Sequence, residues 1–404
     1  AIMGGYTMKK LWAAPILLAE SQATAGGWEA SKLDTSFMYH EGGFTEFSYG
    51  SLDYNVKANA TNNGATLGVT GHKTAKSQTR PALSLKMGFG DFDFGVSSFT
   101  SGSIQMQGGA GKIIDPAIDF TATPPAPTAT QPAGATFVPD ADATLTTMSF
   151  IGKYNVSENF GVIIGASQNS LAKTKITTIL GTYDLKAKSA MGSIVGAVYS
   201  QPDIAMRVEL LVQPKSTIKA DSSYSEATGG GNSADEWMAA AGGVSSDASF
   251  TTTLSRPETI TLNFQSGIAA DTLLYGSIHK AAWKSAQLMA ATDSALTTVT
   301  SEFTDTTALS LGVARKINEQ LALTASLSSE DGGGKTSTSL FTQSNGSQGI
   351  SLGARYTIDN ITISGGYNYT NVGDVTVNSS AGVQQAVYKN NNVSAIGLKI
   401  GFAF

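Results

Sequence analysis

The chain has 404 residues, of which 44 are Gly, 14% are charged and none is Cys. The formal net charge of −5 argues against a nucleic-acid partner, which would require a basic patch. The absence of cysteine excludes a disulfide framework, a thiolate nucleophile and a cysteine-based zinc site. The sequence also lacks an apolar run of roughly 18 residues, the length that a transmembrane helix needs.

The first predicted element is a secretory signal peptide. Met8-Lys9-Lys10 precedes the apolar stretch 11–19, and Ala-Thr-Ala follows at 23–25. A basic start, a short apolar core and an A-x-A end are typical of such a peptide. We interpret residues 1–25 as upstream residues plus this peptide, with cleavage before Gly26. A retained N-terminal extension is the alternative.

From Phe44 onward the sequence alternates between apolar and polar residues, in segments separated by turns. This pattern predicts 14 strands. The expected ranges are 43–58, 81–89, 91–101, 144–155, 159–178, 181–200, 203–220, 254–269, 271–289, 303–316, 319–330, 347–358, 360–376 and 391–404. A β-sandwich would show the same periodicity and is the main alternative fold.

The last strand is the most informative segment. In Ser394–Phe404 one parity is fully apolar, from Ile396 to Phe404, and the other is small or polar, with Lys399 at its centre. An outer-membrane barrel places one such face against lipid and the other against a polar lumen.

Short turns also alternate with long polar connections along the chain. The long connections are residues 101–143, 221–253, 289–304, 331–347 and 377–391. Outer-membrane barrels combine short periplasmic turns with long extracellular loops. We therefore predict that residues 44–404 form an all-β, antiparallel, multi-pass barrel in the bacterial outer membrane.

Three segments carry a family resemblance. They are Ala25–Gly50, Arg80–Val96 and Ser255–Trp283, the last of which opens a strand with Pro257-Glu258 and ends at a Trp. This order of elements resembles the FadL family of outer-membrane transporters for long-chain fatty acids and other hydrophobic compounds. The Asn-Pro-Ala element found in better-known members is absent here.

The resemblance implies an N-terminal plug, here residues 26–43, inside a monomeric barrel. It implies passive uptake of hydrophobic molecules, such as long-chain fatty acids, hydrocarbons or aromatics, past the lipopolysaccharide layer. An outer groove would capture the ligand and a lumen pocket would receive it. The terminal Phe404 resembles the signal read by the barrel assembly machinery. Two other functions remain open: a general porin for small polar solutes, and a non-transport surface barrel such as an adhesin.

No enzymatic motif or cofactor-binding motif is recognisable. The three histidines, His40, His72 and His279, are far apart and no H-E-x-x-H occurs. The sequence also lacks a G-x-S-x-G nucleophile elbow and a phosphate-binding loop. We therefore predict neither an enzyme nor a metal or cofactor site.

Strand parity predicts which charges face the lumen. The inward set is Lys153, Arg207, Glu209, Arg355 and Lys399. These residues are either ordinary lumen residues that pair with one another, or contacts for a substrate carboxylate, which a guanidinium can bind through two hydrogen bonds. Arg207 and Arg355 are the preferred candidates for that contact.

Four apolar residues complete the candidate ligand site. Trp237 and Met238 fall in the 221–253 connection, where they would form part of the capture groove or pack the loops together. Trp28 and Phe37 fall in the expected plug, where they would line the inner pocket or seal the barrel.

Overall fold

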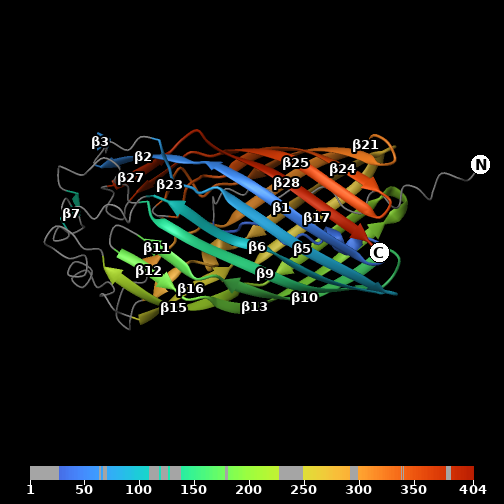
Figure 1. The fold of residues 1–404 in the computed structure, drawn as a ribbon, viewed down its shortest axis with the longest axis horizontal. Coiled ribbons are helices and arrows are strands. Elements are labelled where there is room, and N and C mark those ends of the chain that lie inside the picture. The colour runs from blue at the N-terminus through green and yellow to red at the C-terminus, as the bar shows by residue number, and fades with distance from the viewer. Residues whose placement is uncertain are drawn as a thin grey trace, which may run out of the picture.

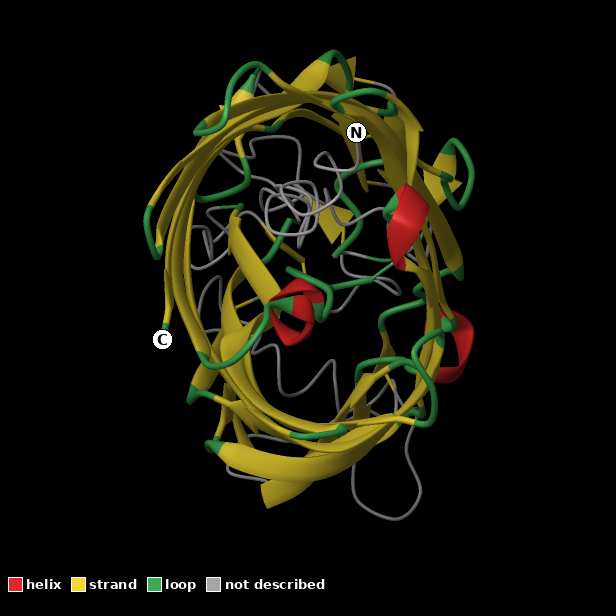
Figure 2. Ribbon diagram, turned by 90° about the vertical axis from the view of Figure 1, so that its right-hand side faces the viewer, coloured by secondary structure: helices red, strands yellow, loops and turns green. Residues whose placement is uncertain are grey.

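The computed structural model describes residues 27–62, 65–66, 71–108, 118–119, 126–127, 138–177, 181–226, 249–291, 299–337, 339, 341–378 and 384–404. Within them the chain forms a closed antiparallel barrel of 14 strands (Figures 1 and 2). Each strand pairs with its neighbours along the chain, and β1 closes the ring by pairing with both β5 and β28. The predicted fold class and strand number are confirmed.

The barrel strands are β1 (Phe44–Asn55), β5 (Gln78–Phe89), β6 (Phe92–Gln107), β9 (Asp140–Asn155), β10 and β11 (Phe160–Leu171, Thr174–Thr177), β12 and β13 (Gly181–Leu185, Lys188–Gln201), β14 and β15 (Met206–Gln213, Ser216–Glu226), β16 and β17 (Ser249–Arg256, Thr259–Ala269), β18 and β19 (Thr272–Ala281, Met289–Ala291), β20 and β21 (Val299–Thr300, Thr306–Lys316), β22 (Leu321–Glu330), β24 (Ser347–Ile358), β25 (Ile361–Val372) and β28 (Asn391–Ala403). Several strands therefore extend into segments expected to be loops: β6 continues to Gln107 and β15 to Glu226.

The remaining elements are short. A second sheet at the loop end contains β2 (Lys57–Asn62), β3 (Ala65–Thr66), β4 (His72–Lys73), β23 (Thr336–Ser337), β26 (Val375–Asn378) and β27 (Gln384–Tyr388). A separate pair joins β7 (Ile118–Asp119) and β8 (Ala126–Pro127). The 3-10 turns are η1 (Ser36–Tyr39), η3 (Pro202–Ile204) and η4 (Trp283–Ser285).

The two ends of the barrel differ in their connections. Tight turns join the strands at the end where β28 finishes, on the right of Figure 1. In two of these turns an aspartate adopts positive φ, at Asp271 and Asp359 (φ 53° and 50°), a conformation that Asp tolerates. The long connections leave from the opposite end, so the barrel has a short-turn end and a loop end.

The polarity of the wall reverses along the barrel. Near the short-turn end, the outward residues are apolar and exposed, as at Phe47 and Tyr49 on β1. Further along the same strand Leu52 and Tyr54 are buried on the inward face, whereas Asp53 is exposed on the outside. An apolar exterior suits lipid, and a polar exterior around an apolar interior suits water. The barrel wall therefore leaves the membrane at the level of the middle of β1.

β9 shows the same reversal. Met148 and Phe150 face outward and are exposed near the short-turn end, whereas Leu145 and Ala143 are buried inside near the loop end. Buried apolar residues of the loop-end half form one large cluster, which includes Trp28, Leu52, Ile104, Leu145, Ile218, Leu254, Trp283 and Val393. The loop-end half is thus packed like the core of a water-exposed β-barrel.

Candidate functional site

The N-terminal segment, residues 27–43, lies against an irregular part of the wall. β5 and β6 pair from the Phe89–Phe92 turn to Ala82 and Phe99, where their pairing ends. Beyond that point a bulge at Thr100–Gly102 interrupts the β6–β9 register. The segment pairs with this part of β6: Ala30 N–H donates to the Ser101 carbonyl (2.9 Å), and Ser103 N–H donates to the Trp28 carbonyl (2.8 Å). We call the place where β5 and β6 part the β5–β6 gap.

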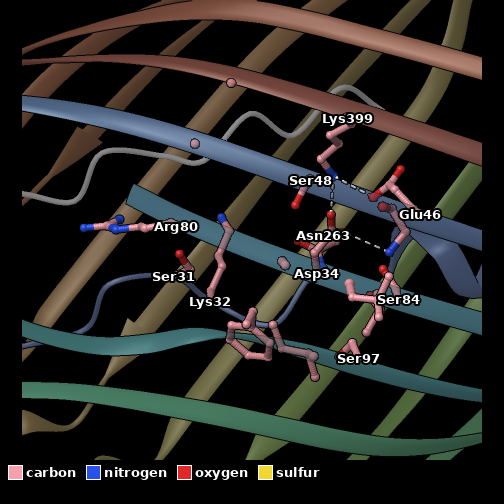
Figure 3. Close-up of a pocket in the computed structure, with 18 of the residues that line it drawn as sticks. Ser31, Lys32, Asp34, Glu46, Ser48, Arg80, Ser84, Ser97, Asn263 and Lys399 are labelled. Atoms are coloured by element: carbon pink, nitrogen blue, oxygen red, sulfur yellow. Dashed lines mark hydrogen bonds and ion pairs between the residues drawn. The ribbon is translucent and has the colours of Figure 1, made fainter. Parts of the chain in front are cut away.

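A cavity of about 150 Å³ lies between the segment and the wall beside this gap. It is lined by the segment and by residues from β1, β5, β6, β14, β17, β18 and β28. Figure 3 shows the labelled charges that border it, among them Lys32, Arg80 and Lys399. We call this space the lumen cavity.

One wall of the lumen cavity is fixed by a charge network. Lys399 on β28 donates to Asp34 (2.8 Å) in the segment and to Glu46 (3.2 Å) on β1 (Figure 3). Burial by itself raises the pKa of the Asp34 carboxyl, but the charge and hydrogen bond of Lys399 outweigh burial and lower this pKa to about 2. The network holds the middle of the segment against β1 and β28.

The opposite wall holds the segment through Glu209 on β14. The Glu209 carboxylate accepts hydrogen bonds from Thr35 Oγ1 (2.6 Å), from the Tyr39 hydroxyl and from Asn263 Nδ2 (2.9 Å). Because β14 and β28 face each other across the lumen, these contacts and those of Lys399 fix the segment from both sides. Figure 2 shows a short helical turn inside the ring of strands.

Tyr39 separates the lumen cavity from a larger space at the short-turn end. That space, which we call the vestibule, measures about 1520 Å³. Tyr39, Arg207 and Gln265 line both spaces. The Arg207 guanidinium lies 3.8 Å from the centre of the Tyr39 ring and donates to Gln265 Oε1 (3.0 Å). Within the described part of the chain, this stacked pair lies between the two spaces.

The start of the segment is anchored by a buried histidine. His279 on β18 lies 2.9 Å from Glu29 Oε2 and 2.8 Å from Thr261 Oγ1. A carboxylate, an imidazole and a hydroxyl in sequence also occur in hydrolases. Here, however, Thr261 and His279 line none of the described cavities. The arrangement therefore serves to attach the segment to the wall.

Lys86 on β5 also connects the segment to the barrel. Lys86 donates to the carbonyls of His40 (2.7 Å) and Gly42 (2.9 Å) and pairs with Asp93 (2.7 Å), which also pairs with Lys153 (2.9 Å).

Farther toward the loop end, a cavity of about 30 Å³ lies beside Trp28 and is lined by Ile104, Met106, Phe303 and Phe341, among others. We call this the tryptophan cavity.

The predicted site residues separate into distinct places. Trp28 is 2% exposed, lines the tryptophan cavity and donates from Nε1 to the Ser255 carbonyl (3.4 Å). Phe37 is buried in an apolar cluster with Phe44, Ile151 and Ile163 and lines none of the described cavities.

The remaining predicted residues do not form one site with these two. Arg355 lines the vestibule and not the lumen cavity, which Arg207 does reach. Trp237 and Met238 lie outside the described residues. The inward orientation predicted for Lys153, Arg207, Glu209 and Lys399 is present, since each contacts the N-terminal segment.

Arg80 is not among the residues predicted from the sequence, although it lines both the lumen cavity and the tryptophan cavity. A local signal was available: on β5, Arg80, Ala82, Ser84 and Lys86 share one parity, and the other parity carries Leu83 and Leu85. That alternation places Arg80 inward in the same way as Lys86.

Two negative observations apply to the described residues. None of their helices is long and apolar enough to span a membrane. No group of three or more His, Cys, Asp or Glu side chains among them is placed to hold a metal ion.

Comparison with known proteins places the fold. No family model and no curated protein matches the sequence. Among solved structures, a Pseudomonas aeruginosa FadL homologue is similar with a TM-score of 0.70 at 14% identity, covering 98% of both chains. The Pseudomonas putida toluene transporter TodX gives a TM-score of 0.60 at 12% identity over 94% of this chain and 96% of TodX. The Ralstonia pickettii toluene transporter TbuX gives 0.59 at 11% identity over 96% and 98%. This outer-membrane barrel therefore has the fold of the FadL family.

Proposed function

We propose that the protein is a passive outer-membrane channel for hydrophobic molecules. The observation that carries this proposal is the N-terminal segment, which crosses the lumen and yet leaves a cavity beside the β5–β6 gap. The similarity to structures described as toluene transporters supports the same class of substrate. No coupling to an energy source is required, because transport runs down a concentration gradient.

We propose the following path. An apolar molecule enters at the loop end, where the barrel interior is apolar, and moves toward the tryptophan cavity. The N-terminal segment acts as the plug, and its movement away from β6 connects the lumen cavity with the β5–β6 gap. Burial of apolar ligand surface stabilises the bound state by about 25 cal/mol per Å².

Two measurements test the function itself. Native mass spectrometry of the barrel after incubation with C12–C18 fatty acids and alkyl aromatics should show a stoichiometric adduct. In planar bilayers the protein should be nearly silent, because the segment is held from both sides of the lumen. Large steady conductance steps without an adduct would instead support a general porin, and silence without an adduct or uptake would support a surface barrel.

A disulfide tests the role of the segment. Glu29 and Gly102 are directly opposed in an antiparallel bridge, and the chain has no cysteine of its own. In the variant Glu29→Cys/Gly102→Cys, oxidation should lock the segment to β6 and stop uptake, and reduction should restore it. The two single-cysteine variants control for the loss of the Glu29–His279 contact and for crowding at Gly102. Equal uptake before and after oxidation would exclude movement of the segment at this position.

A further inference from the structure

We infer that Arg80 binds the anionic head group of an amphiphilic substrate. The inference rests on the proposed function and narrows the substrate from hydrophobic molecules in general to those with a carboxylate or a similar anionic end. It assigns the head-group contact to Arg80 in place of Arg207 and Arg355, the residues favoured by the sequence.

Arg80 is a buried cation with neutral partners. The residue is 6% exposed. One guanidinium nitrogen donates to the Ala30 carbonyl and another to the Tyr54 hydroxyl (2.7 Å). The third, Nε, is buried and has no hydrogen-bond partner, and no described carboxylate pairs with this guanidinium. Burial of a charge without a counter-charge is unfavourable, so the site gains stability when an anion enters it.

Other buried cations of the lumen differ in this respect. Lys86 and Lys153 share Asp93, and Lys399 contacts both Asp34 and Glu46. Arg256 resembles Arg80 more closely, because it is buried and donates to the amide oxygens of Asn169 and Gln213. Arg256, however, lines none of the described cavities. Among these groups, Arg80 both lacks a carboxylate partner within the described residues and lines a cavity that a ligand can enter.

The position of Arg80 suits an amphiphile. The residue lies between the lumen cavity, which has charged walls, and the tryptophan cavity, which is lined by Trp28, Met106 and Phe303. A carboxylate at the guanidinium would leave the attached chain beside the apolar residues of the loop-end half. At about 30 Å³ the tryptophan cavity is too small for an alkyl chain, so binding requires the N-terminal segment to shift.

The hydrogen bonds of Arg80 determine which of its present contacts a head group would replace. The guanidinium donates to Ala30, which is the residue that pairs with β6 at the β5–β6 gap. A carboxylate is a stronger acceptor than a neutral carbonyl and can accept two hydrogen bonds from one guanidinium. A carboxylate bound to Nε takes Nη2 as its second donor, so it would replace the Tyr54 hydroxyl, while Nη1 keeps its hydrogen bond to the Ala30 carbonyl.

The test compares dodecanoate with dodecanol, which has the same chain length and no charge at neutral pH. Arg80→Gln should weaken dodecanoate binding by about tenfold or more, the effect of losing a hydrogen bond to a charged group, and should leave dodecanol binding within about twofold. The matched control Arg256→Gln should leave the ratio of the two affinities unchanged. Equal losses for both ligands in Arg80→Gln, or no loss of dodecanoate binding, would overturn the inference.

A measurement on the unchanged protein covers the case in which Arg80→Gln does not fold. The unmodified barrel should bind dodecanoate more tightly than dodecanol, and equal dissociation constants would also overturn the role of Arg80. Failure of the proposed function looks different. If neither compound binds the folded barrel, the channel for hydrophobic molecules is wrong, whereas binding of both with equal affinity leaves the channel in place and removes only head-group selection.

Discussion

The two halves of the barrel use the same alternating strands with opposite polarity. In the short-turn half, apolar residues face outward and the lumen holds charges such as Lys399, Glu209 and Asp93. In the loop-end half, the interior is packed with apolar residues around Trp28 and the outside is polar. The same strands thus contact lipid in the short-turn half and water in the loop-end half. The N-terminal segment runs through both halves, with Trp28 in the apolar one and Asp34 to Tyr39 in the charged one.

The largest effect is expected in the loop-end half. Trp28→Ala should lower the free energy of unfolding by about 3–5 kcal/mol, because it removes a fully buried aromatic side chain and leaves a cavity. Trp28→Phe should cost clearly less, since most of the ring volume remains. Urea titration followed by heat-modifiable gel mobility measures both. A loss below about 1 kcal/mol for Trp28→Ala would mean that this interior is not packed as a core.

A pair of charge substitutions locates the boundary between the halves. Thr146 and Phe150 both face outward on β9 and have the same parity along the strand. Phe150→Arg should cost about 2–4 kcal/mol, the penalty for arginine facing the middle of the bilayer, whereas Thr146→Arg should be nearly neutral. Both are read from the same urea titration in lipid vesicles. Equal costs at the two positions would place Thr146 in the membrane and contradict the polarity reversal.

The charged half should contain the barrier to water and ions. Tyr39→Ala removes the ring that lies between the lumen cavity and the vestibule, so single-channel recordings should show conductance steps that the unmodified protein lacks. Tyr39→Phe keeps the ring and its stacking with Arg207 and should remain silent. A silent Tyr39→Ala channel would move the barrier to another contact, such as Asp34 with Lys399.

The smallest effect at neutral pH is expected from His40, which makes docking of the segment dependent on pH. Burial, together with the positive charges of Arg355, Arg207 and Lys86, lowers the pKa of the His40 imidazole from 6.5 to about 3. The released segment therefore takes up a proton below pH 6.5 that the docked segment excludes. Docking is at full strength above pH 6.5 and weakens as the pH falls toward 3.

Hydrogen exchange of residues 27–43 measures this dependence. After correction for intrinsic exchange rates, protection should fall by up to about tenfold per pH unit below 6.5. His40→Gln should remove the slope. Asp34 does not contribute in this window, because its pKa is lowered from 3.8 to about 2, so its share of docking is lost only below about pH 4. A slope that persists in His40→Gln would assign the dependence to another group.

Local alternation was sufficient to predict the number of strands, their order and the inward orientation of residues such as Arg207 and Lys399. The same rule, applied to β5, would have placed Arg80 inside. It could not distinguish the two halves of the wall, because it places Phe47 and Leu52 on opposite faces of β1 but does not tell that the surroundings of the wall change from lipid to water between them. Nor could it rank the cations, since Arg80, Arg207 and Arg355 are equivalent by parity.

The sequence by itself determined a 14-stranded barrel with short turns at one end and long connections at the other, because side-chain alternation and turn formation depend on neighbours along the chain. Only the tertiary structure decided where β5 and β6 part, which charges are neutralised and which space Arg80 borders. Lys399 meets Asp34 across 365 positions of the sequence. Such partners are chosen by ring closure and by the path of the N-terminal segment through the lumen, and neither is encoded in any short stretch of residues.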